Sequence, residues 1–104
     1  MANSFGADII IRTPEPQVAA TFYVDLLGFE VTAEEPMISL HGDNINLFIE
    51  RGPEHGPVFE VRVENIAEAK LNLLRSGCEL VMDEPEVPRC YVKDPFGLTY
   101  NLTS

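Results

Sequence analysis

Residues 91–102 read YVKDPFGLTYNL, and this stretch determines how the end of the chain folds. Its central residues, 94–97, place proline where a β-turn needs a fixed φ and glycine where it needs conformational freedom. We therefore expect the residues on either side to pair as a hairpin. After the turn, apolar residues alternate with Thr99 and Asn101, as in a half-buried strand. One face of this strand is expected to pack in a core, and the other can face a ligand.

Length and composition are typical of one globular domain. The chain has 104 residues, of which 45% are hydrophobic and 23% are charged, and this length supports a single core. The net charge of -10 would repel phosphate groups, so we expect neither nucleic acid nor a membrane as partner. The N-terminus lacks the apolar segment of a signal peptide or membrane span. We predict a cytoplasmic protein in which Cys78 and Cys90 are reduced thiols.

The same order of predicted elements occurs twice. In the first half, an alternating strand over residues 7–12 is followed by prolines that suit a helix start, a helix, and Gly28 as its C-cap. The apolar positions of that helix recur with helical spacing at Ala19, Phe22, Tyr23, Leu26 and Leu27. In the second half, a strand over residues 58–63 precedes a helix that begins after Asn65 with a capping box and ends at Gly77.

Each half then continues with sequence typical of strands and turns. The later strands are expected at about 29–32, 37–40 and 44–50 in the first half, and at about 79–83, 90–93 and 98–103 in the second. The result is an α+β fold of two βαβββ modules within a single domain, residues 1–104. Module 1 covers about residues 5–51, a linker rich in Gly and Pro about 52–57, and module 2 about 58–104.

Two segments resemble the vicinal oxygen chelate superfamily, which includes glyoxalases, bleomycin resistance proteins and extradiol dioxygenases. Residues 22–31, FYVDLLGFEV, are similar to its first helix and turn, and residues 92–102, VKDPFGLTYNL, to its closing hairpin. The resemblance implies that the paired modules form a curved open sheet with a concave ligand cavity. It also implies a homodimer, because members of the superfamily commonly complete the cavity from two chains.

Metal-dependent members of the superfamily take His or Glu ligands from the first and last strand of each module. By this resemblance, the ligand positions fall on Asp8, on Asn46 or Phe48 depending on register, on Val58 and on Asn101. Valine cannot bind a metal, and an asparagine carbonyl is a weak replacement for a carboxylate. We therefore expect no metal cofactor. The alternative is a divalent ion in an atypical site, where Glu50 or Glu60 joins Asp8 after a shift of register.

Polar residues of the predicted strands define the candidate ligand face. Arg12 and Arg62 occupy matching places in the two modules, and a guanidinium in a concave site suits a carboxylate or another anionic group of a small molecule. Alternatively, these arginines pair with Asp8 and Glu60 at the sheet edge. The predicted ligand-binding residues are Asp8, Arg12, Asn46, Phe48, Glu60, Arg62 and Asn101.

Three functions fit these observations. We favour metal-independent binding of a small organic ligand, as in bleomycin resistance proteins, because the metal positions lack donors. The alternative is a metal-dependent lyase or dioxygenase, with Glu60 as the catalytic group that moves a proton. The third is an interaction module without a pocket. His41 and His55 fall in a predicted turn and in the linker, so we interpret both as surface residues.

Overall fold

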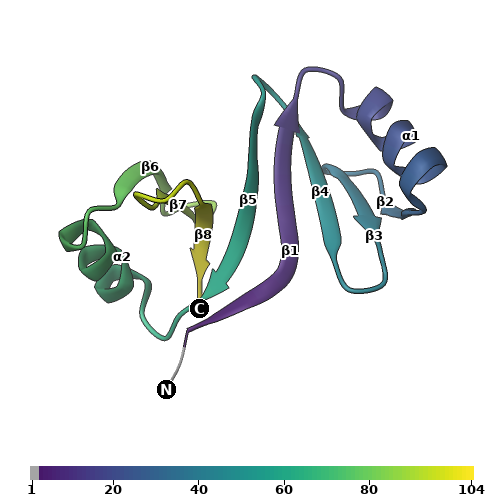
Figure 1. Ribbon diagram of the computed structural model, residues 1–104. Coiled ribbons are helices and arrows are strands. Elements are labelled where there is room, and N and C mark those ends of the chain that lie inside the picture. The colour runs from purple at the N-terminus through teal and green to yellow at the C-terminus, as the bar shows by residue number, and fades with distance from the viewer. Residues whose placement is uncertain (1–2) are drawn as a thin grey trace. The chain divides into compact units, whose positions relative to one another are not determined.

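The computed structural model describes residues 3–104, which form two compact units. The first unit is residues 7–57, and the second unit is residues 58–104 together with residues 3–6. The elements follow in the order β1 (Ser4–Thr13), α1 (Pro16–Leu27), β2 (Glu30–Ala33), β3 (Ile38–His41), β4 (Asn46–Arg51), β5 (His55–Arg62), α2 (Ile66–Arg75), β6 (Glu79–Glu84), β7 (Arg89–Lys93) and β8 (Thr99–Thr103) (Figure 1). This order confirms the α+β class and the repeated βαβββ pattern.

In the first unit the strands run in the order β2-β3-β4-β1, with β1 parallel to β4 and the other pairs antiparallel. Helix α1 packs on one face of this sheet, against β3 and β4 (Figure 1). The buried core between them consists of Ala20, Ile38, Leu40, Leu47 and Ile49. Alternation along β4 thus places Leu47 and Ile49 beneath the helix and leaves their neighbours on the opposite face.

Helix α1 starts and stops as its sequence predicts, but its apolar residues divide between two faces. Gly28 has a positive φ of 80° and donates its backbone N–H to Tyr23 O, which ends the helix. Tyr23 packs against the core, whereas Phe22 is 52% exposed and Leu26 is 67% exposed. The predicted single apolar stripe is therefore wrong, and α1 carries apolar residues on its outward face as well.

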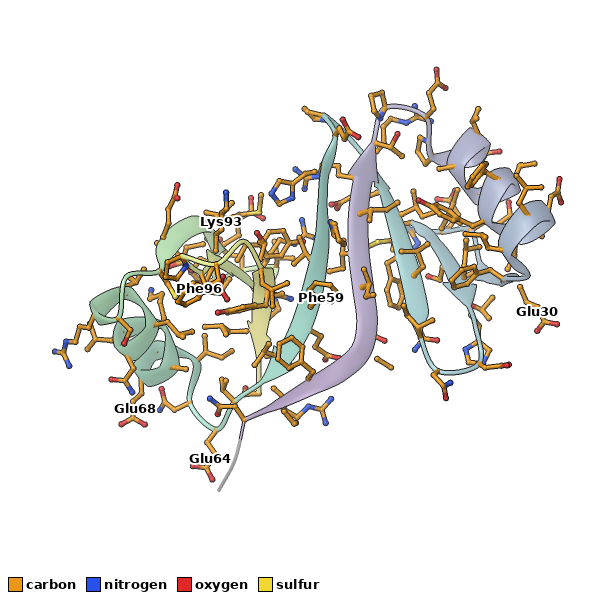
Figure 2. All side chains as sticks on the ribbon, viewed as in Figure 1. Glu30, Phe59, Glu64, Glu68, Lys93 and Phe96 are labelled. Atoms are coloured by element: carbon orange, nitrogen blue, oxygen red, sulfur yellow. The ribbon has the colours of Figure 1, made fainter. Side chains whose placement is uncertain are left out.

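The second unit repeats the arrangement with strands in the order β5-β8-β7-β6, where β5 and β8 are parallel. Helix α2 packs on β8 over a buried core of Val61, Val63, Cys90, Val92, Tyr100 and Leu102. The predicted cap is present, because Asn65 Oδ1 accepts a 2.9 Å hydrogen bond from the backbone N–H of Glu68. Figure 2 shows Glu64 and Glu68 pointing away from this unit, and both are exposed.

Several boundaries differ from the expectation from sequence, among them the start of β1 at Ser4. Strand β5 begins at His55, so the second half of the predicted linker is extended backbone. Leu98 lies before β8 and is exposed, although its spacing from Tyr100 predicts a core position. Between residues 3 and 104, neither helix has the length and apolar character needed to cross a membrane.

The carboxylate of Asp94 stabilises the turn of the closing hairpin by accepting three hydrogen bonds. Its Oδ1 accepts hydrogen bonds from the backbone N–H groups of Phe96 and Leu98 at 2.9 and 3.0 Å, and its Oδ2 accepts one from the hydroxyl of Tyr100 at 3.1 Å. The Leu98 N–H is the main reason that the pKa of Asp94 is lowered, and burial is the main reason that the pKa of Tyr100 is raised. The same turn leaves the Phe96 ring 93% exposed (Figure 2).

Candidate functional site

The face of the first unit opposite α1 carries most of the residues that sequence patterns single out. We call this the open face, the side of β1, β3 and β4 that α1 does not cover. Pairing in register brings the residues of the three strands side by side on it. They are Asp8, Ile10 and Arg12 of β1, Ser39 and His41 of β3, and Asn46, Phe48 and Glu50 of β4.

Three polar side chains form a row across the open face, which we call the polar row: His41, Asn46 and Asp8. Asn46 Nδ2 donates a hydrogen bond of 2.9 Å to Asp8 Oδ1. Asn46 Oδ1 lies 2.8 Å from His41 Nδ1. Asp8 and Asn46 are half-buried, and His41 is exposed at the end of β3. The row thus adds side-chain hydrogen bonds across three strands whose backbones are already paired.

An apolar strip lies next to the polar row, two residues along the strands. It consists of Ile10 and Phe48, which are directly paired between β1 and β4 and are both half-buried. Ser39 extends this line onto β3. Such a strip offers a flat apolar floor for the body of a small molecule.

A charged pair closes the open face on the far side of the apolar strip. Arg12 donates from Nε and from Nη2 to Glu50 Oε1, at 3.1 and 2.8 Å, and each side chain is 26% exposed. The guanidinium also needs the absence of a side chain at Gly52, because a Cβ there would lie 2.5 Å from Arg12 Cδ. The structure therefore pairs Arg12 with Glu50 and not with Asp8, because β1 and β4 bring residues 38 positions apart into register.

The remaining predicted residues lie in the second unit, on the face opposite α2. The carboxylate of Glu60 lies 3.4 Å from Thr103 Oγ1, which donates to it, and 3.7 Å from Arg62 Nη2. Glu60 also occupies the space in which a Cβ on Gly6 would sit. The Arg62 side chain is 67% exposed, so this ion pair is a surface pair of small energetic weight.

Asn101 has a structural partner that its position in the sequence does not reveal. Its Oδ1 accepts a 2.9 Å hydrogen bond from the backbone N–H of Cys90, which ties β8 to β7. Burial raises the pKa of the neighbouring Cys90 thiol, which suits an unreactive packed cysteine. Val58, at the matching position of β5, is only 1% exposed.

The residues at the superfamily's metal positions do not fit a divalent ion. Transition metals need several donors about 2 Å from one ion, yet Asp8 has the Asn46 amide as neighbour and Val58 has no donor atom. Glu50, which the atypical alternative requires, is four residues further along the sheet, about 13 Å away at 3.3 Å per residue. No group of three His, Cys, Asp or Glu side chains is placed to share an ion within the described part of the chain.

Sequence reasoning missed His41 and Glu50 as residues of the open face. The sequence predicts His41 in a turn, but β3 includes it, and alternation from the buried Leu40 places it on the open face. For Glu50 the sequence suggests only a role as metal ligand. Its role as partner of Arg12 depends on the parallel register of β1 and β4, which no local pattern reports.

The hollows described beside α1 contain none of the predicted ligand residues. A shallow groove of about 220 Å³ lies between α1 and the edge of the sheet, with Ala20, Val24, Val31 and Ile38 as its apolar lining. All of these residues belong to the helix side of the first unit. The open face is therefore defined by the chemistry and register of its side chains and not by a closed cavity.

The fold places the chain in a known structural class. A glyoxalase/bleomycin resistance protein/dioxygenase superfamily member from Vibrio splendidus matches with a TM-score of 0.66 at 19% identity, over 95% of this chain and 97% of that chain. A hypothetical protein from Bacillus halodurans matches with a TM-score of 0.67 at 12% identity, over 98% and 94%. Homoprotocatechuate 2,3-dioxygenase from Brevibacterium fuscum, in complex with 3,4-dihydroxyphenylacetate, gives a TM-score of 0.67 at 23% identity, over 98% of this chain but 37% of the dioxygenase. These similarities confirm the fold.

Within this structural class, the chain can be assigned to one family. Residues 8–103 match the glyoxalase-like domain family, so the chain belongs to it. The resemblance to the superfamily seen in the sequence is thereby confirmed. No curated protein gives a significant match.

Proposed function

We propose that this glyoxalase-like protein binds a small organic ligand on its open face without using a metal ion. The observation that carries the proposal is the hydrogen bond between Asn46 and Asp8. By the resemblance, Asp8 and, in one of the two registers, Asn46 fall on metal-ligand positions of the superfamily, and here the two side chains bond to each other. The pair is half-buried and in register, which suits recognition of polar groups better than coordination of a cation.

The layout of the open face indicates the kind of ligand. The apolar strip of Ile10 and Phe48 lies between the polar row and the pair of Arg12 and Glu50, and these two borders are about 13 Å apart. A flat, largely apolar molecule with polar groups at its ends fits this spacing. Because Glu50 offsets the charge of Arg12, we expect the group near Arg12 to be a polar or singly charged one.

Binding assays on protein treated with a chelator test the proposal. We would screen aromatic carboxylates, beginning with benzoate and 2-naphthoate, by thermal shift and by chemical-shift perturbation. Phe48→Ala and Arg12→Ala are expected to weaken binding, while Arg75→Ala, an exposed residue in the last turn of α2, leaves it unchanged. Equal binding by Phe48→Ala and the unmodified protein would sink the proposal.

Catalysis by Glu60 stays a prediction, and so does the alternative of a metal-dependent lyase or dioxygenase. Glu60 interacts with Thr103 and Arg62, which support its position equally well in a structural role. Cytoplasmic location likewise stays a prediction from the sequence.

We also propose that two copies associate through the outward face of α1. Val18, Phe22 and Leu26 form a row at four-residue spacing there, each more than half exposed. A helix that is apolar on both faces is normally buried on both. Val18 and Leu26 lie at equal distances on either side of Phe22, so two antiparallel copies related by a two-fold axis bring Val18 of each opposite Leu26 of the other.

Charge favours a second copy at this place. Each chain carries a net charge of -10, so copies repel over most of their surface. Within α1 the one charged residue is Asp25, whereas α2 carries Glu68, Lys70 and Arg75. The outward face of α1 is thus a nearly neutral apolar surface on which a like-charged copy can pack.

A further inference from the structure

We infer that His41 is the proton acceptor of the open face, and that Asn46 and Asp8 act as its positioning residues by fixing its tautomer. The inference rests on the proposed ligand site and specifies the chemistry at one edge of it. A ligand bound there would carry a weakly acidic O–H or N–H group, such as a phenol, an enol or a heteroaromatic N–H.

The hydrogen bonds of the polar row can run in only one direction. At neutral pH the Asp8 carboxylate only accepts, so the Asn46 group that faces it at 2.9 Å is the NH2. The Asn46 carbonyl oxygen is then the atom that faces His41 at 2.8 Å. Because a carbonyl oxygen only accepts, His41 Nδ1 carries the proton.

A proton on Nδ1 leaves a lone pair on Nε2 of the neutral imidazole. This nitrogen lies on the side of the ring away from Asn46, and His41 is exposed at the end of β3. An amide that orients a histidine in this way prepares it to take a proton or accept a hydrogen bond.

His41 also stands beside the surface on which a ligand would lie. Its row is two residues, roughly 7 Å, from the row of Ser39, Phe48 and Ile10. If the aromatic ring of a ligand lies on the apolar strip, a substituent at the edge of that ring can therefore lie next to His41. The other histidine, His55, belongs to β5 and serves as an internal comparison.

The tautomer is measured first, because it does not depend on any ligand. Long-range 1H–15N correlation spectra of 15N-labelled protein at about pH 8, where imidazoles are ordinarily neutral, distinguish protonated Nδ1 from protonated Nε2. His55→Gln assigns the two rings. We expect His41 with its proton on Nδ1, and a mixture of tautomers in Asn46→Leu. A proton on Nε2 of His41 in the unmodified protein would overturn the inference.

Ligand chemistry is tested at about pH 8 with a matched pair of probes, phenol and anisole, which differ in the acidic O–H. We expect phenol to bind about tenfold more tightly, the factor that one good hydrogen bond gives. His41→Phe should remove this preference. Equal affinities for the two probes in the unmodified protein overturn the inference but leave the ligand site standing, whereas a failure of both to perturb Phe48 overturns both proposals.

Discussion

The side-chain amide of Asn46 donates a 2.9 Å hydrogen bond to Asp8, across the parallel pair of β4 and β1. Asp8, and Asn46 as one of two register alternatives, are the positions where metal-dependent members of the superfamily are expected to place ligands. In this chain their side chains satisfy each other. The surface that would hold an ion elsewhere is therefore a hydrogen-bonded patch here.

Replacing Asn46 with Asp should destabilise the protein at neutral pH. The change sets two carboxylates side by side in a half-buried place and removes the donor to Asp8, at a cost of about 1–3 kcal/mol. The loss should shrink as the pH falls, because protonation of one carboxylate restores a donor. Urea unfolding at about pH 7 and pH 4 measures this. Asn44→Asp, in the exposed turn before β4, is the control, and an equal loss in both variants would contradict the account.

Asp94→Asn should lower the melting temperature at neutral pH and have little effect in strong acid. The folded state lowers the pKa of Asp94 below its ordinary value of 3.8. Its stabilising contribution is therefore fully present above that value and is lost as the pH falls through the lower, folded pKa. Melting curves of both proteins from neutral pH down to about pH 2 should converge at the acid end. Asp25→Asn, a change at an exposed residue of α1, is the control and should leave the melting temperature unchanged at each pH. If the melting temperature of Asp94→Asn lies below that of the unmodified protein by the same amount at every pH, the carboxylate does not have this role.

Val58→Ala should cost about 1–3 kcal/mol of unfolding free energy, as expected for removal of buried methyl groups. Val58 falls on a ligand position of the superfamily by the resemblance, but its side chain is only 1% exposed and packs in the core. Val87→Ala removes the same groups from an exposed side chain and should cost less than about 0.5 kcal/mol. Chemical denaturation gives both values. A similar cost for the two substitutions would show that Val58 does not serve as core.

Phe22→Glu should abolish self-association, because it puts a negative charge at the centre of the apolar row on α1. Analytical ultracentrifugation over a range of protein concentrations follows the dimer. The control is Phe96→Glu, which adds the same charge at an even more exposed phenylalanine in the closing turn. The dimer should persist in that variant. A monomer at all concentrations in the unmodified protein, or equal loss in both variants, would refute the proposed interface.

Local patterns were sufficient to predict most of the fold. Proline at the start of α1, Gly28 at its end and the Asn65 cap all act within a few residues, so the sequence displays them directly. The outward placement of Phe22 and Leu26 was not predictable, because helical spacing alone does not say how wide a face the sheet covers.

The candidate site was predictable only in part, for a related reason. Alternation along single strands placed Asp8, Arg12 and Asn46 on one face. The partners of these residues depend on the register between strands, so the contact of Arg12 with Glu50 and that of Asn46 with His41 emerged only from the structure. Asn101 shows the same limit, since its bond to the Cys90 backbone involves the neighbouring strand.

The metal content of the purified protein distinguishes a bound ion from a hydrogen-bonded pair at Asp8. Protein purified without chelators would be examined by elemental analysis and then titrated with Zn²⁺, Mn²⁺ and Fe²⁺ while its melting temperature is followed. We expect no stoichiometric metal and no ion-specific stabilisation, with the same outcome for Asp8→Ala. One tightly held ion per chain, or a large stabilisation by one ion that Asp8→Ala removes, would contradict this expectation.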